Sequence, residues 1–279
     1  MSSSKWPKVF PPLTAEQKAI SDDFMKTWLT VLPQKYGAIE RFNHRYPVRH
    51  APADFRRTLE IGAGLGEHLN YEALTARQRA NYHAVDFRAN ITAELSRRCP
   101  DIHVVTGDCQ ERLDYPDGYF DRIMAIHVLE HLPDLPRCVR EMHRLCDKAR
   151  GAFSIVIPCE GSLAYSLARK VSAQRIFERR YKQPYKWFIE REHVNRPHEI
   201  IEELSPYFTI SHRNFFPFRF IPAVWCNLVI GLTLRPRAVP LNADRNGQDT
   251  RVIGGRISWP TRFQQPAPTH STRRSMTTS

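Results

Sequence analysis

The sequence predicts an α/β fold in which a mostly parallel sheet carries helices on both faces. Short apolar runs at residues 58–62, 82–86, 102–106, 120–127 and 152–158 are separated by stretches with helical patterning. Such alternation is typical of right-handed βαβ units, whose crossover helices cover a parallel sheet. Two later apolar runs, 208–215 and 227–234, predict a further pair of strands joined by a bend that contains proline.

The composition is that of a globular protein that folds without covalent staples. Of 279 residues, 42% are hydrophobic and 25% are charged, so the chain can bury a full core. The six cysteines form no CxxC pair, which favours neither a zinc site nor a disulfide framework, and we expect reduced thiols. Residues 1–7 lack the apolar stretch of a signal peptide, so we expect a cytoplasmic protein.

The net charge of +12 raises the question of nucleic-acid binding. Residues 1–150 are close to charge balance, and the basic excess falls in residues 151–240 and 241–279. Neither a dense Lys/Arg cluster nor a known nucleic-acid motif accompanies that excess. We therefore expect no specific nucleic-acid partner.

Residues 1–54 predict a helix followed by a loop that leads into the core. Thr14 and Gln17 form a capping box, in which each side chain satisfies a backbone donor of the other residue. An apolar face at four-residue spacing predicts a helix that ends near Pro33. The residues of that face are Ile20, Phe24, Trp28 and Leu32. Residues 37–55, with two prolines and polar aromatics, predict the loop.

Residues 55–240 form the predicted main domain, which carries an insertion at about residues 160–200. After Pro240 the chain is rich in Pro, Thr, Ser and Arg, so we expect residues 241–279 to be disordered. Residues 220–234 have no charge, but a membrane-spanning helix needs about 20 apolar residues. We therefore expect a buried closing strand and no transmembrane segment, while peripheral membrane contact stays open.

The strongest local signal is the glycine-rich segment 58–68, TLEIGAGLGEH. Glycine allows the positive φ of a tight turn and lets a ligand approach the backbone, and the first turn of such a sheet lies where ligands bind. A phosphate-binding P-loop would need Gly-Lys-Ser/Thr, where Glu67 and His68 stand. A dinucleotide fingerprint would need glycine at position 67, and Glu67 at a helix start would repel a pyrophosphate.

Residues 60–66 resemble the acidic-x-Gly-x-Gly-x-Gly motif of the class I S-adenosylmethionine-dependent methyltransferases. Asp86 ends the second strand about twenty residues later, the spacing at which a carboxylate reaches ribose hydroxyls. Residues 104–110, VVTGDCQ, are similar to the third-strand turn of that family. Residues 117–132, DGYFDRIMAIHVLEHL, are similar to the fourth-strand signature of its small-molecule members, the type 11 methyltransferases.

This resemblance implies a Rossmann-like sheet of seven mostly parallel strands with an antiparallel last strand. It implies S-adenosylmethionine as cofactor, with Glu60 and Gly62 at its methionine end and Gly64 and Gly66 in the same turn. The remaining cofactor-binding positions are carried over from the family motifs. They are Asp86 for the ribose, Phe87 against the base, Asp108 with its neighbour Cys109 for the adenine, and the backbone near Ile126 for the methionine ammonium.

Residues 127–131, HVLEH, match the inverted zinc-protease motif HxxEH. That chemistry needs both histidines on one face of a helix, where they converge on a metal. Here an apolar run predicts a strand up to residue 126, so His127 would end a strand and His131 would begin the next turn. We therefore expect no metal at this motif.

His131 is the candidate catalytic residue. In the sugar and small-molecule O-methyltransferases that this segment resembles, a histidine at this position faces the acceptor hydroxyl. An imidazole, with an ordinary pKa near about 6.5, can accept a proton at neutral pH. The alternative is that His131 only packs against the cofactor. Cys159 follows the fifth strand, where related RNA cytosine methyltransferases place a nucleophile, but their Pro-Cys is absent, so we expect a buried thiol.

The insertion carries the hints about substrate. Leu163, Leu167 and Val171 have helical spacing, and basic and aromatic residues surround them. Such side chains suit a phosphorylated sugar, a nucleotide-sugar or a lipid-linked glycan, unless they form only a solvated basic face. Residues 157–170 also resemble methyltransferases of bacterial surface-polysaccharide clusters.

We therefore expect O-methylation of a small molecule. The alternatives are N- or C-methylation, or a nucleic-acid-binding protein with a vestigial cofactor site.

Overall fold

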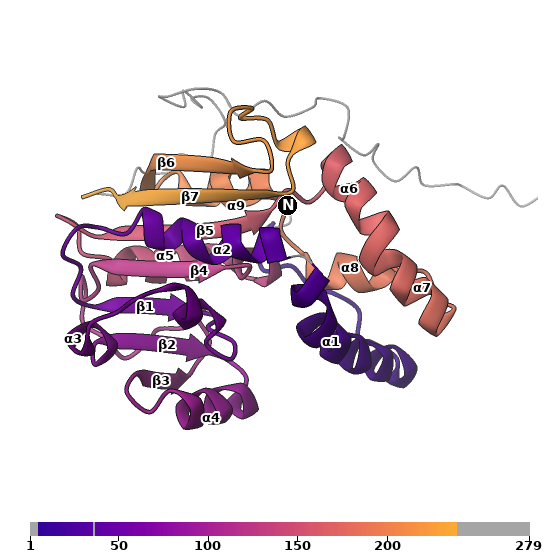
Figure 1. Cartoon of the computed structure of the whole chain (residues 1–279), viewed down its shortest axis with the longest axis horizontal. Coiled ribbons are helices and arrows are strands. Elements are labelled where there is room, and N and C mark those ends of the chain that lie inside the picture. The colour runs from indigo at the N-terminus through magenta and orange to yellow at the C-terminus, as the bar shows by residue number, and fades with distance from the viewer. Residues whose placement is uncertain (1–4, 36, 239–279) are drawn as a thin grey trace, which may run out of the picture.

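One sheet organises the chain in the computed structural model, which describes residues 5–35 and 37–238, without the side chains of residues 26–35. Its seven strands have the order β3-β2-β1-β4-β5-β7-β6 (Figure 1). They are β1 Thr58–Ile61, β2 Tyr82–Asp86, β3 His103–Thr106, β4 Arg122–Ile126, β5 Ala152–Pro158, β6 Phe208–Phe216 and β7 Val229–Pro236. The first five strands are parallel, and β7 runs antiparallel to both neighbours. The predicted fold class is confirmed.

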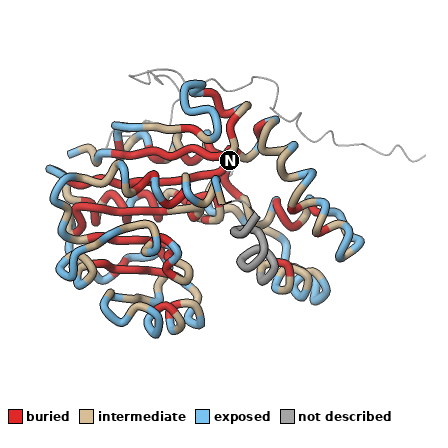
Figure 2. The backbone as a smooth tube through the Cα atoms, in the orientation of Figure 1, coloured by how far each residue is buried: buried red, intermediate tan, exposed pale blue. Residues whose placement is uncertain are grey.

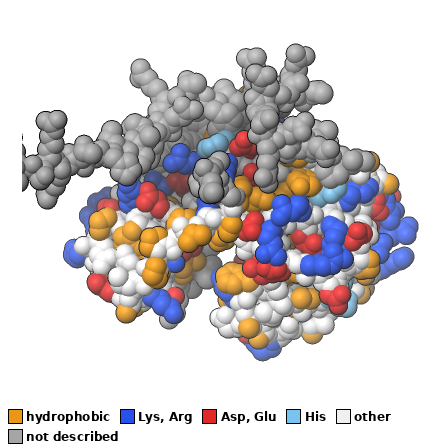
Figure 3. Space-filling model, turned by 180° about the vertical axis from the view of Figure 1, so that it is seen from behind, with side chains coloured by type: hydrophobic (Ala, Val, Ile, Leu, Met, Phe, Trp, Pro, Cys, Tyr) orange, Lys and Arg blue, Asp and Glu red, His pale blue; other side chains and the backbone are white. Residues whose placement is uncertain are grey.

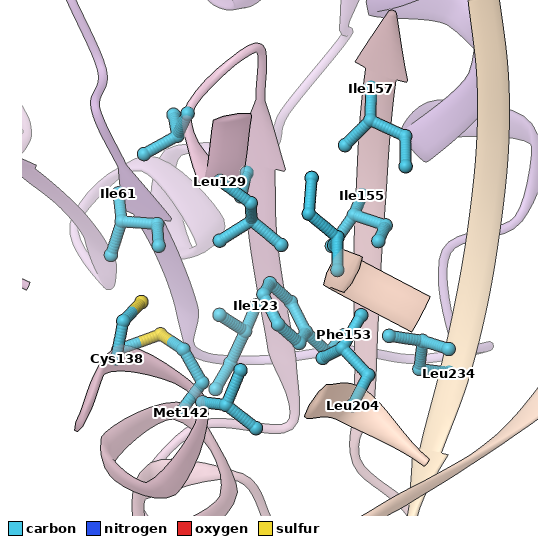
Figure 4. Packing of buried hydrophobic residues seen from close by; sticks show 14 of the residues in the cluster. Ile61, Ile123, Leu129, Cys138, Met142, Phe153, Ile155, Ile157, Leu204 and Leu234 are labelled. Carbon is cyan, nitrogen blue, oxygen red and sulfur yellow. The ribbon is translucent and has the colours of Figure 1, made fainter. Parts of the chain in front are cut away.

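Helices cover both faces of this sheet because side chains alternate along buried strands. On one face, Ile61, Ile123 and Ile155 share a core with α5 Leu135–Leu145 and α9 Pro197–Leu204 (Figure 4). On the other face, Met124 packs with Leu95 of α4 Ala89–Arg98. That second face is also covered by α2 Gly37–Arg49, which packs on β5 and β7.

The expectation of a loop over residues 37–55 was wrong, because α2 occupies most of that segment. Pro47 suggested a break, but it lies in the last turn of the helix, where the lost backbone hydrogen bond matters less than packing. Tyr46 is buried against Gly231, where a Cβ would lie 2.5 Å from the ring. Its hydroxyl pairs with the Thr233 Oγ1 at 3.1 Å. Tertiary contacts therefore hold this helix.

The N-terminal helix α1 Ala15–Lys35 joins the insertion rather than the sheet. The insertion folds into α6 Leu163–Arg169, the π-helical turn η3 Lys170–Gln174, α7 Arg175–Tyr181 and α8 Lys186–Glu192. Phe24 lies edge-on to Phe177 at 5.0 Å and to Phe188 at 5.2 Å, in a small buried cluster (Figure 2). These helices form a lobe beyond the strands' carboxyl ends (Figure 1).

Some expectations cannot be compared with the structure. The side chains of Trp28 and Leu32 and the tail 241–279 lie outside what it describes. Residues 220–234 contain the short turn η4 Val224–Cys226 and most of β7. Within the described residues, no helix has both the length and the apolar character needed to cross a membrane.

Candidate active site

The glycine-rich turn leaves the carboxyl end of β1 in a conformation that requires glycine. Gly62, Gly64 and Gly66 have φ of 64°, 55° and 82°. A Cβ on Gly62 would lie 2.4 Å from the Val128 Cγ2, and one on Gly66 would lie 2.7 Å from the Leu95 Cδ1. The turn is therefore wedged between neighbouring elements, which fixes its backbone at the sheet's carboxyl edge.

Glu60, two residues before Gly62 on β1, has a buried side chain. Its side chain is almost fully buried, and the Tyr82 hydroxyl donates to its Oε2 at 2.6 Å. Burial raises the pKa of Glu60 to about 8, although the hydrogen bond from Tyr82 acts in the opposite direction. In this geometry the Glu60 carboxyl is directed toward Tyr82 inside the fold.

Asp86 connects the second strand to the turn. Its Oδ2 accepts a hydrogen bond from the Gly64 backbone N–H at 3.2 Å. Burial acts to raise the pKa of Asp86, but hydrogen bonds from Arg88 outweigh burial and lower it. The carboxylate is therefore ionised and directed toward the glycine turn, as the predicted ribose contact requires.

The predicted adenine side lies at the ends of β2 and β3, which are adjacent in the sheet. Phe87 is 71% exposed, and the Arg88 guanidinium lies 5.5 Å from the centroid of its ring. Asp108 is exposed, and its Oδ1 accepts the Gln110 backbone N–H at 2.9 Å. The Cys109 side chain is buried in the core, so only its backbone can face a ligand. Ile126 lies on the opposite side of the turn, at the end of β4.

His131 lies at the end of the short turn η2 Leu129–His131 and faces a second histidine. The His131 and His193 rings are 5.1 Å apart and nearly perpendicular. The His131 Nδ1 lies 2.6 Å from the Glu192 carbonyl oxygen, which assigns the proton to Nδ1 and the lone pair to Nε2. Burial lowers the pKa of His131 to about 4, so the ring is neutral at pH 7.

Glu130 lies behind His131 and is completely buried. Its Oε1 is 3.0 Å from the His127 Nδ1. Burial acts to raise the pKa of Glu130, but the interactions with His127 and the other imidazoles lower it. His127 thus pairs with Glu130 and does not turn toward His131. Within the described part of the chain, Glu130, His131 and His193 are the group whose ligand atoms, all within 4.8 Å of one another, could hold a metal ion.

Sequence reasoning gave no role to Glu130, Glu160 or Glu192, and it considered His193 only as an alternative base to His131. Glu130 was part of the HxxEH match, and His193 belonged to the insertion. Glu160 and Glu192 position the two imidazoles through the His193 Nδ1 and the His131 Nδ1. No local spacing signals this arrangement, because the insertion returns to the sheet only in the folded chain. Cys159, in contrast, is fully buried as expected.

Sequence comparisons find methyltransferases among the proteins that this chain resembles. The family described as methyltransferase domain matches residues 59–154. The malonyl-[acyl-carrier protein] O-methyltransferase of Halorhodospira halophila is 33% identical over 101 residues, 36% of this chain and 33% of that protein. The phosphatidylethanolamine N-methyltransferase of Cereibacter sphaeroides is 27% identical over 139 residues, 48% of this chain and 65% of that protein. The chain thus spans less than two thirds of these relatives.

A solved structure is similar over most of the chain. It is the putative methyltransferase in complex with the Haloferax volcanii Trm112 methyltransferase activator. The TM-score is 0.54 at 11% identity, over 77% of this chain and 98% of that one. At that identity the likeness concerns the fold alone.

Proposed function

This chain belongs to the class I S-adenosylmethionine-dependent methyltransferases, and on that premise we propose that it methylates a hydroxyl oxygen of a small-molecule acceptor. The methyl donor is S-adenosylmethionine. One observation carries the proposal: the Gly64–Asp86 contact and His131 lie at the same carboxyl edge of the sheet. Donor and acceptor groups would therefore meet at that edge.

The cofactor would lie along this edge in the order of the strands. The strands β4, β1, β2 and β3 are neighbours in that order. Ile126 ends β4, the glycine turn follows β1, Asp86 ends β2 and Asp108 follows β3. Neighbouring strands are about 4.8 Å apart, so the series suits an extended ligand. We assign its methionine end to Ile126 and the turn of Gly62, Gly64 and Gly66, supported by Glu60. We assign the ribose to Asp86. The adenine base is assigned to Phe87, Asp108 and the Cys109 backbone.

His131 is the proposed catalytic residue. Methyl transfer is an in-line displacement that depends mainly on positioning, whereas an alcohol must also lose its proton. The Nδ1 bond to Glu192 directs the lone pair of Nε2 away from the backbone. Because His131 is only partly exposed, that atom meets an acceptor inside the site rather than bulk water.

The helical lobe would cap the acceptor pocket. It combines α1 with the insertion 160–200, and on the face drawn in Figure 3 a hollow separates this lobe, on the left, from the larger one. The proposed division of the chain follows: residues 55–240 form the methyltransferase domain, and the insertion selects the acceptor.

A surface of exposed apolar side chains favours a lipid-linked, phosphorylated glycan among the acceptors considered. The residues are Leu163, Leu167 and Val171, 62–67% exposed, and Phe218, Phe220, Ile221 and Trp225, 47–96% exposed. The two groups adjoin because α6 packs on η4 and the Ser162 Oγ donates to the Asn227 carbonyl at 3.1 Å.

Exposed basic residues accompany this apolar surface, namely Lys170, Arg175, Arg179 and Arg219. Apolar side chains beside cations, with Trp and Phe among them, are typical of segments that lie on anionic membranes. The stripe on α6 thus faces outward, which sequence periodicity alone did not indicate. We propose that an anionic bilayer contacts this surface.

Vesicle sedimentation tests this surface. The protein should bind vesicles of phosphatidylcholine with phosphatidylglycerol more tightly than phosphatidylcholine alone, and Phe220→Glu and Leu167→Glu should weaken binding. Val9→Glu, at a residue that is 86% exposed elsewhere, is the control. Equal sedimentation of all variants would contradict the assignment, as would self-association of the wild type that Phe220→Glu abolishes.

The acceptor atom is tested with isotopically labelled S-adenosylmethionine. Incubation with hydroxyl- and amine-bearing acceptors, followed by mass spectrometry, should place the label in methyl ethers. Label confined to amines would replace O-methylation with N-methylation.

A further inference from the structure

Three side chains of metal-ligating type converge beside the proposed acceptor site. Glu130 and His131 come from η2, and His193 follows α8. Their ligand atoms lie within 4.8 Å of one another. The HxxEH match thus contributes Glu130 and His131 to this group, while His193 takes the place that the motif would give to His127.

Glu130 is a buried carboxylate that the described residues do not fully satisfy. Its Oε1 interacts with the His127 Nδ1, but its Oε2 is inaccessible to solvent and has no hydrogen-bond partner among those residues. Leaving a buried carboxylate oxygen unpaired costs free energy. A cation beside this oxygen would remove that cost.

Both histidines are held in the way that metal-binding histidines usually are. The His131 Nδ1 donates to the Glu192 carbonyl at 2.6 Å, and the His193 Nδ1 lies 3.0 Å from the Glu160 Oε2. Glu160 is itself paired with Arg169, which fixes its carboxylate. Such partners orient the ring and leave Nε2 as the ligand. The His131 Nε2 is 4.0 Å from the Glu130 Oε1.

We propose that Glu130, His131 and His193 bind one divalent transition-metal cation, with zinc as the best fit. Two imidazoles and one carboxylate form a ligand set that zinc enzymes use while keeping a fourth position open. Zinc–ligand bonds of about 2.0–2.1 Å need ligand atoms roughly 3.4 Å apart in a tetrahedron, so ligand atoms that lie within 4.8 Å of one another must approach by up to about 1.4 Å. His131, the most exposed of the three, marks the side of entry.

The role of the cation rests on the proposed function. An acceptor hydroxyl in the open position would bind the metal through oxygen, which lowers its pKa and lets its proton pass to water. The oxygen then attacks the methyl carbon, the S–CH3 bond breaks as the O–CH3 bond forms, and the sulfonium becomes a neutral thioether. In the metal-loaded enzyme, His131 therefore acts on the hydroxyl as a metal ligand, and in the metal-free enzyme as a proton acceptor.

Metal binding itself provides the test. Chelator-stripped protein is titrated with Zn²⁺ by calorimetry, and metal content after dialysis is measured by mass spectrometry. The wild type should bind about one Zn²⁺ per chain, and His131→Ala and His193→Ala should weaken binding at least roughly 100-fold. Glu160→Gln, which removes only the outer partner, should weaken it about 10- to 100-fold. His103→Ala, at an exposed histidine on β3, is the matched control.

Binding of S-adenosylhomocysteine to every variant verifies the fold and separates the two proposals. Wild type that binds S-adenosylhomocysteine but no Zn²⁺ overturns the metal site and leaves the proposed function intact. Wild type that binds Zn²⁺ but no S-adenosylhomocysteine supports the metal site and contradicts the proposed function. Zn²⁺ affinity that His131→Ala and His193→Ala leave unchanged places the ion elsewhere and also overturns the proposal.

Discussion

Arg88 holds Asp86 in a two-point ion pair, with the Arg88 Nε 3.0 Å from Oδ1 and Nη2 3.0 Å from Oδ2. The two carboxylate oxygens that are assigned to the ribose hydroxyls therefore accept hydrogen bonds from the Arg88 guanidinium. The Arg88 side chain is 34% exposed, whereas that of Asp86 is 2% exposed. Arg88 can thus swing into solvent when a ribose arrives, while Asp86 stays in place.

Arg88→Ala should bind S-adenosylhomocysteine as tightly as the wild type or up to about 5-fold more tightly. A partly exposed ion pair contributes only about 0–1 kcal/mol, so little is lost when the ribose replaces it. Calorimetry measures the affinity, and Arg97→Ala, at an exposed arginine of α4, is the control. A loss of 5-fold or more would mean that Arg88 contacts the cofactor.

Asp86→Ala should weaken S-adenosylhomocysteine binding by about 1–3 kcal/mol, because ribose hydroxyls and the Gly64 N–H lose their acceptor. Asp86→Asn keeps one oxygen acceptor and should lose less. Both affinities come from calorimetry, with circular dichroism to verify folding. Wild-type affinity in a folded Asp86→Ala protein would refute the assignment of the ribose to the end of β2.

Glu60 should make the protein less stable as the pH rises from 5 to 8. Burial raises the pKa of Glu60 from 4.5 to about 8, so the folded chain binds more protons than the unfolded chain between these values. The contribution of Glu60 is complete below about pH 4.5 and is lost as the pH rises toward 8. In thermal melts without ligand, the Tm of Glu60→Gln relative to wild type should therefore increase with pH. A Tm difference between Glu60→Gln and wild type that does not change with pH would mean that Glu60 is already ionised in the folded chain.

His131→Ala should lower kcat by roughly 10²–10⁴-fold with little change in cofactor affinity. The prediction holds whether His131 accepts the proton or holds a metal, because either way it serves the acceptor hydroxyl. Steady-state kinetics and calorimetry measure the two quantities. Near-normal turnover would make His131 a packing residue and favour either a nitrogen acceptor, which needs no base, or another base such as His193.

The sheet and the glycine turn at its carboxyl edge could be predicted because their signals are local. The run of residues 58–62 ends in glycines whose positive φ few other residues tolerate, and Asp86 follows at a spacing that the βαβ unit determines. The burial of Glu60 against Tyr82 was not predictable, because motif spacing does not show which way a side chain points.

The misread segments depended on tertiary packing. Ile39, Phe42 and Tyr46 are spaced as in a helix, but prolines such as Pro47 favoured a loop. The contact between Tyr46 and Gly231 explains why the helix persists. The helical spacing of Leu167 predicted a helix but not which side of it would be buried, and Leu167 lies exposed because Phe177 and its aromatic neighbours form the lobe's core. The convergence of His131 and His193 likewise follows from the path of the insertion.

The most direct test of the central claim is methyl transfer itself. The purified protein is incubated with isotopically labelled S-adenosylmethionine and a membrane extract that contains lipid-linked glycans, beside Asp86→Ala and His131→Ala as controls. We predict label in an O-methyl group of a glycan lipid, with release of S-adenosylhomocysteine, and strongly reduced label with both variants. Absence of label from every fraction, together with calorimetry that detects no binding of S-adenosylhomocysteine, would contradict the account.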